Sequence, residues 1–208
     1  MDHYFTIKKR EEALLKIEGS KFIAEAVPVY TRDEAEDYLR SVRKNYFDAT
    51  HHCYAYAIGE QRAVFQYSDD GEPSGTAGVK IFSAIQAGAM SDLLVVVTRY
   101  FGGVKLGVGG LGRAYHDAAS DVLKKAEKLV RMPVVLVTAT VSYPFVTPLM
   151  NLCARAQTVI ADAHYAEQVT FTLHVPAGRE ADIERQIVEL TNGTALVARG
   201  ERLIRSAG

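Results

Sequence analysis

The stretch RYFGGVKLGVGGLGRAY, residues 99–115, places a glycine-rich loop between an apolar strand and an amphipathic helix. Residues 93–98 form an apolar, β-branched run of strand length, and residues 111–129 repeat apolar side chains at helical spacing. Six glycines lie within the eleven residues 102–112. Because glycine loses the most conformational entropy on ordering, this density predicts positive φ angles or a close approach of the backbone to another group.

A strand, a glycine loop and a helix N-terminus in this order are the usual construction of an anion site. Lys105 lies in the loop and Arg113 in the first turn of the expected helix. Cations at this end oppose the helix dipole, at a cost of about 0.3–1 kcal/mol each. An anionic ligand would remove that cost. An ion pair of Arg113 with Asp69, Asp70 or Glu72 would remove it too, and the sequence leaves both interpretations open.

The anion-site interpretation predicts that backbone N–H groups at the helix start converge on one point, with cations and an aromatic side chain around them. The candidate anion- or nucleic-acid-binding residues are Arg99, Tyr100, Lys105, Gly109, Gly110, Leu111 and Arg113. Phe101 is a second candidate for stacking on a base. Core packing at a strand end is the alternative role for both aromatic side chains.

Two phosphate motifs are excluded. Residues 107–112 fit GxGxxG, but residues 100–106 separate the motif from the strand, and residues 134–142 offer no carboxylate for a ribose. The pattern GxxxxGK[ST] is absent from the sequence. We therefore expect no nucleotide cofactor.

A second candidate patch combines HHC at residues 51–53 with the acidic turn SDDGEPSGTAG at residues 68–78. Neighbouring strand residues point to opposite faces, so the two histidines cannot easily share a metal, and no second Cys/His pair has zinc-site spacing. Adjacent Cys and His rarely hold the geometry of nucleophilic attack. We expect no metal and no catalytic residue here, and Ser74 or Thr76 should cap the next helix. The patch residues are His51, His52, Asp69, Asp70 and Glu72.

Composition excludes several classes of protein. No apolar run approaches the length of a membrane span, and the first residues, MDHYFTIKKREE, are too polar for a signal peptide. The two cysteines are far apart without a CxxC pair, so a reduced, cytoplasmic protein is expected. The net charge is −1, with 18 Lys and Arg against 18 Asp and Glu in residues 1–132. Nucleic-acid binding would therefore need a local patch.

The best boundary between domains is Arg131-Met132-Pro133, which divides the chain into residues 1–132 and 133–208. Beyond it the pattern predicts a strand at 134–142, a helix from 147, strands at 158–164 and 169–176, a helix at 179–190 and a strand at 196–204. This βαββαβ order is the ferredoxin-like split motif. The expected fold class is α+β with two domains.

Three motifs, HHCYAY, SDDGEPSGTAG and RYFGGVKLGVGGL, occur in an order and spacing that resemble the bacterial branch of the IMPACT family, over residues 18–128. The second half resembles the C-terminal ferredoxin-like domain of that branch in length and pattern. The resemblance implies a first domain with the fold shared by GHMP kinases and domain four of elongation factor G. The second domain would then correspond to domain five of that factor.

The resemblance also implies a role in translation, because eukaryotic relatives regulate translation under amino-acid starvation. Those relatives carry an additional N-terminal RWD domain, for which this chain has no room. We expect a translation-associated regulatory or binding protein that contacts RNA, the ribosome or another phosphate-bearing partner through the glycine-rich loop. The alternative is an enzyme that acts on a phosphorylated small molecule at the same loop. The missing kinase motif and general base favour binding over catalysis, and the oligomeric state stays open.

Overall fold

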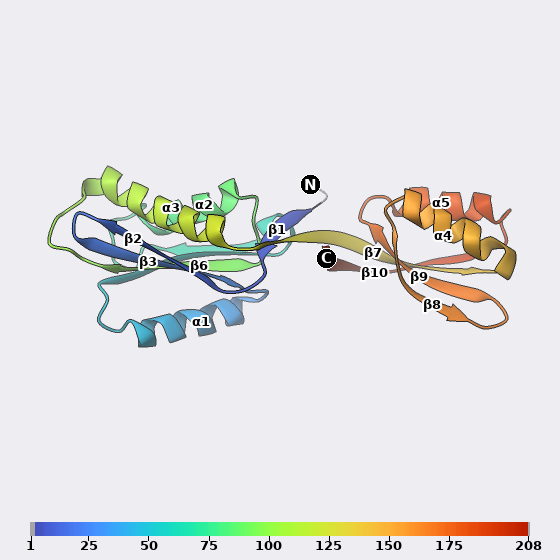
Figure 1. Ribbon diagram of the computed structural model, residues 1–208, viewed down its shortest axis with the longest axis horizontal. Coiled ribbons are helices and arrows are strands. Elements are labelled where there is room, and N and C mark those ends of the chain that lie inside the picture. The colour runs from blue at the N-terminus through green and yellow to red at the C-terminus, as the bar shows by residue number, and fades with distance from the viewer. Residues whose placement is uncertain (1–2, 208) are drawn as a thin grey trace. The chain divides into compact units, whose positions relative to one another are not determined.

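The computed structural model describes residues 3–207, which form two compact units, His3–Val130 and Arg131–Ala207. Figure 1 shows the helices and strands of both units. The helices are α1 (Arg32–Asn45), α2 (Gly78–Ala87), α3 (Gly107–Lys125), α4 (Val146–Arg155) and α5 (Glu180–Leu190). The strands are β1 (Tyr4–Ile7), β2 (Glu11–Ile17), β3 (Ser20–Pro28), β4 (His51–Ile58), β5 (Val64–Ser68), β6 (Leu93–Tyr100), β7 (Lys128–Val141), β8 (Val159–Tyr165), β9 (Val169–Pro176) and β10 (Leu196–Ala207). No helix of the described part of the chain is long and apolar enough to cross a membrane.

The first unit is built on a five-stranded sheet in the order β2-β3-β6-β4-β5. Helices α2 and α3 cover one face of this sheet and α1 covers the other (Figure 1). Strand β6 pairs with β3 on one side and β4 on the other, both antiparallel. The prediction that residues 93–98 form a central strand is confirmed.

Both faces of β6 are buried, which explains its continuous apolar sequence. Val95 and Val97 join the core beneath α2 and α3, whereas Leu94 and Val96 join the core beneath α1. Successive strand residues point to opposite faces, so one strand serves two cores. The sheet therefore fixes the position of the loop that leaves β6 at Tyr100.

The second unit has the element order β7-α4-β8-β9-α5-β10, the βαββαβ order predicted from the sequence. Strand β7 pairs with both β9 and β10, and β8 pairs with β9. Helices α4 and α5 lie on the same face of this sheet (Figure 1). Alternate residues of β9, from Val169 to Val175, are buried in their core as the pattern predicts.

Strand β7 begins at Lys128 and not at residue 134, where the sequence analysis starts it. Its ladder with β9 begins at Val134. Pro133 therefore lies just outside that ladder, where its missing N–H removes no hydrogen bond between the two strands. In the sequence Pro133 indicates a boundary between domains. In the structure β7 continues through Pro133.

The predicted caps of α2, Ser74 and Thr76, are wrong. The Oδ1 atom of Asp69 accepts hydrogen bonds from the N–H groups of Ala77 and Gly78, at 2.9 and 2.8 Å. The cap thus comes from a carboxylate eight positions before the N-cap residue Ala77. A negative charge at this place also suits the helix dipole.

We expect Asp69→Ala to lower the free energy of unfolding by about 2 kcal/mol, because it removes a charged cap from α2. Urea denaturation followed by circular dichroism measures the change. Asp121→Ala, which removes an exposed carboxylate from α3, is the matched control and should change stability by less than about 0.5 kcal/mol. Equal effects of the two substitutions would contradict the capping role.

Candidate functional site

The N-terminus of α3 has no side-chain cap. Leu106 is the N-cap residue, and the first turn contains no acidic side chain. In the helical pattern, the N–H groups of Gly107, Val108 and Gly109 have no carbonyl partner. The end of a 19-residue helix thus offers free donors and the positive end of its dipole.

The sequence pattern places these donors too late in the chain. It predicts that the N–H groups of Gly109, Gly110 and Leu111 converge, but the helix already begins at Gly107. The N–H groups of Gly110 and Leu111 therefore bond to carbonyls of the preceding turn, and only Gly109 keeps a free donor. Glycine propensity alone suggests a later start, and packing of the helix against the sheet overrides it.

The positions of this segment require glycine for different structural reasons, and one of them does not require it. A Cβ atom on Gly102 would overlap the backbone of Gly19, so no other residue fits in that turn. Gly107 has φ +69°, a conformation that favours glycine. Gly109 has neither constraint: it is helical, and a Cβ atom there would meet nothing within 4 Å. Its backbone is therefore open to an approaching group.

A buried ion pair lies behind the loop. Nη1 of Arg99, from β6, lies 2.6 Å from Oε1 of Glu72, and the two residues are 6% and 9% exposed. The hydroxyl of Tyr115, from α3, donates to the same oxygen at 2.7 Å. The Arg99 guanidinium also lies 5.3 Å from the ring centre of Phe22 and 5.5 Å from that of Phe101. This cluster joins the 68–78 loop, the central strand and α3.

The partners of the two arginines differ from those considered in the sequence. Arg99, a candidate binding residue, binds Glu72 through Nη1. Arg113 forms no ion pair with any residue from 3 to 207, so the internal pairing with Asp69, Asp70 or Glu72 does not occur. Because α3 begins at Gly107, Arg113 lies in its second turn and not in the first turn, as the sequence predicts. It has no internal counterion in the described part of the chain.

The residues of the second candidate patch connect β4 to the 68–78 loop. Nδ1 of His51 lies 2.8 Å from the carbonyl oxygen of Asp70, and the N–H of His52 donates to Oδ2 of Asp70 at 2.6 Å. The thiol of Cys53 donates to the carbonyl of Asp69 at 2.9 Å. Burial raises the pKa of the Cys53 thiol far above its ordinary value, which disfavours a nucleophile. These contacts fasten the 68–78 loop to β4, so they do not form a separate surface site.

Tyr100 does not belong to the site. Its hydroxyl donates to Oδ1 of Asp48 at 2.8 Å, and Nζ of Lys21 lies 5.6 Å from its ring centre. Strand alternation turns it away from Arg99. Phe101, 47% exposed, lines the hollow beside the loop.

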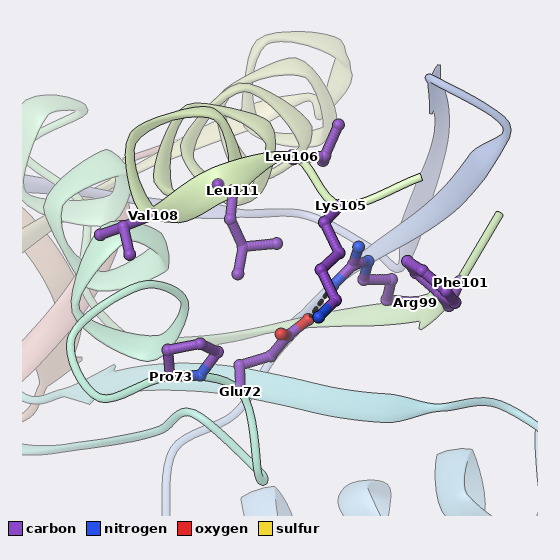
Figure 2. Close-up of a pocket in the computed structure, with 9 residues that line it drawn as sticks. Glu72, Pro73, Arg99, Phe101, Lys105, Leu106, Val108 and Leu111 are labelled. Atoms are coloured by element: carbon purple, nitrogen blue, oxygen red, sulfur yellow. Dashed lines mark hydrogen bonds and ion pairs between the residues drawn. The ribbon is translucent and has the colours of Figure 1, made fainter. Parts of the chain in front are cut away.

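Two hollows flank the start of α3, and Val108 borders both. We call the first the apolar cavity: it measures about 360 Å³, and its apolar wall is Pro73, Phe101, Leu106, Val108 and Leu111. Its polar groups are Glu72, Arg99 and Lys105 (Figure 2). We call the second the cationic groove: it measures about 380 Å³ and contains Lys80, Arg113 and His116.

Sequence reasoning missed Lys80 and His116. Lys80 comes from α2 and His116 from α3. They share the groove because the helices approach closely at Gly112, where a Cβ atom would lie 3.3 Å from Cε of Lys80. The only signal in the sequence is the small residue at position 112, which does not identify its neighbour.

The fold and site define a two-unit α+β protein whose first unit presents a glycine-rich helix N-terminus between an apolar cavity and a cationic groove. Residues 18–123 match the Impact N-terminal domain, and residues 140–194 match a domain of unknown function, DUF1949. The chain belongs to the IMPACT family. The resemblance inferred from the three motifs is confirmed.

Relatives match both units. The chain is 36% identical to IMPACT family member YvyE of Bacillus subtilis, over 95% of this chain and 91% of the relative. It is 38% identical to an IMPACT family member encoded in the pol 5′ region of Thermus thermophilus, over 85% of this chain and 96% of the relative. A solved structure described as a hypothetical protein superposes with a TM-score of 0.64 at 26% identity, over 97% of this chain and 98% of that one.

The ion pair yields a stability prediction. Glu72→Gln should lower the free energy of unfolding by about 3–5 kcal/mol, because it leaves the buried Arg99 charge without a counterion. Arg99→Met should be similarly costly. Combined with Glu72→Gln it should cost clearly less than the sum of the single changes, because no uncompensated charge stays buried. Urea denaturation of the four proteins completes the cycle, and additive effects would contradict the coupling.

Proposed function

We propose that this protein is a non-enzymatic regulator of translation that binds RNA phosphates at the N-terminus of α3 and along the cationic groove. The observation that carries the proposal is the uncapped end of α3, flanked by Lys80, Lys105 and Arg113. None of these three cations forms an ion pair among residues 3–207. Free N–H groups, a helix dipole and unpaired cations together favour a phosphate.

A comparison within the unit supports this assignment. The start of α2 lies beside the second turn of α3, because a Cβ atom on Gly112 would lie 3.8 Å from the carbonyl oxygen of Thr76. The end of α2 is neutralised by Asp69. The first turn of α3 contains no acidic side chain. Lys105 lines the hollow on one side of it, and Lys80 and Arg113 line the hollow on the other side. An anion from outside the described chain removes this unfavourable arrangement.

An RNA strand fits the groove better than a small phosphorylated substrate does. The groove lies between two helices and contains three basic side chains, Lys80, Arg113 and His116, which suits contacts to successive phosphates. Catalysis would need a base, and the carboxylate that lines the apolar cavity, Glu72, is held by Arg99 and Tyr115. Membership of the IMPACT family supports the link to translation.

Arg113→Ala should weaken binding of single-stranded RNA and reduce the slope of log K against log salt by about 0.7, the loss of one phosphate contact. Filter binding across a salt series measures both. Lys124→Ala removes a cation near the other end of the same helix and should leave the slope unchanged. The free energy of unfolding should change by less than about 0.5 kcal/mol in either variant.

The proposal fails if wild type, Arg113→Ala and Lys80→Ala bind RNA with the same affinity and the same salt slope. Co-sedimentation with ribosomes over the same salt range then tests the translation assignment separately. Loss of co-sedimentation in Arg113→Ala but not in Lys124→Ala is the expected result.

Gly109→Ala separates function from stability. The substitution should raise the free energy of unfolding by up to about 1 kcal/mol, because alanine favours a helix and meets no neighbour there. It should also weaken RNA binding, because the methyl group covers the free N–H groups. Denaturation and filter binding measure the two effects. Greater stability with unchanged RNA binding would show that the open backbone is not a contact surface.

A further inference from the structure

We propose that the apolar cavity receives the base of a nucleotide whose phosphate lies at the N-terminus of α3. The inference rests on the proposed function in one respect, the position of the phosphate. It adds a second subsite with its own chemistry, formed by residues outside the cationic groove.

Arg99 has an unsatisfied donor. Its side chain is 7% exposed, and its Nε makes no hydrogen bond within the described residues. Nη1 binds Glu72, and Nη2 has one long contact, 3.5 Å, to Oγ of Ser20. An unpartnered buried N–H group costs free energy. Because the Nε atom is itself inaccessible to solvent, a ligand acceptor reaches it only when side chains at the cavity wall move. Arg99 lines the apolar cavity.

An acceptor lies beside this donor. Oε1 of Glu72 already accepts from Arg99 and Tyr115. The other oxygen, Oε2, has His51 Nε2 at 3.8 Å, which is beyond hydrogen-bond distance. Two residues of the cavity lining, Arg99 and Glu72, thus carry a donor and an acceptor without a hydrogen-bond partner in the described part of the chain. An acyl chain would satisfy neither, whereas the edge of a nucleobase carries both an acceptor and a donor.

The remaining wall suits a flat apolar body. Phe101, Leu106, Val108 and Leu111 line it, and Figure 2 shows the side chains of the helix start on the side opposite Glu72. The volume of about 360 Å³ lies within the range of about 300–1,000 Å³ that small-molecule sites occupy. Gly107 and Lys105 also line the cavity, so a bound base would lie next to the phosphate position.

Two sources share this chemistry, a free nucleotide and an unpaired nucleotide of RNA. Calorimetric titration of the full chain with the four nucleoside 5′-monophosphates, ribose 5-phosphate and inorganic phosphate measures the contribution of the base. A single-stranded oligoribonucleotide tests the second source. At least one nucleoside monophosphate should bind at least about tenfold more tightly than ribose 5-phosphate, the size of effect expected for a base held against an apolar wall.

Two variants test whether the base binds in this cavity. Phe101→Ala removes a half-exposed aromatic ring from the cavity wall and should weaken nucleotide binding at least about fivefold. Phe47→Ala, which removes an exposed aromatic side chain outside the cavity, should have no effect. Arg99→Lys keeps the charge beside Glu72 but removes the Nε donor, and should weaken nucleotides while leaving inorganic phosphate unchanged.

The inference is overturned if ribose 5-phosphate binds as tightly as every nucleoside monophosphate, or if Phe101→Ala and Phe47→Ala bind nucleotides equally. If RNA binding still depends on Arg113 in that case, the proposed function survives without the base subsite. If nucleoside monophosphates bind and depend on Phe101 while RNA does not bind, the base subsite stands for free nucleotides and the RNA function fails.

Discussion

The buried ion pair between Glu72 and Arg99 is the constraint on which the arrangement of the 68–78 loop, the central strand and α3 depends. Two charges leave water in the core of the first unit, and the Tyr115 hydroxyl adds a hydrogen bond to the same carboxylate. Such a pair often adds little net stability, but breaking it is costly. We interpret it as a positioning device, because it holds a loop, the central strand and α3 in one arrangement.

In that arrangement the N-terminus of α2 has a carboxylate cap, whereas the N-terminus of α3 has no side-chain cap. The 68–78 loop is fastened to β4 by His51, His52 and Cys53, and this places Asp69 where it caps α2. The same loop brings Glu72 to Arg99 and Tyr115. The start of α3, whose second turn lies beside the capped start of α2, has free donors of its own and unpaired cations in the hollows beside it. The proposed anion site rests on this contrast more than on the glycines alone.

Local patterns in the sequence predict the elements but not their partners. The apolar run of β6 and the alternation of β9 identify a central strand and a half-buried strand, because burial follows strand period. The partner of Arg99 lies 27 positions away in the sequence. The cap of α2 comes from Asp69, eight positions before Ala77 and outside the usual N-cap position, and the start of α3 depends on packing that overrides propensity. The three motifs that carry the family resemblance meet at the ion pair through His51, Glu72 and Arg99. Sequence reasoning found these residues but assigned a binding role to groups that mainly hold the loop.

The central claim is that the open end of α3, and not the capped end of α2, receives the phosphate. Amide chemical shifts in a ¹⁵N-labelled sample titrated with inorganic phosphate and then with single-stranded RNA test it directly. We expect the largest shifts at the amides of Gly107, Val108 and Gly109, with little change at Ala77 and Gly78, which Asp69 already occupies. Equal shifts at both helix ends, or shifts confined to residues outside the first unit, would contradict the account.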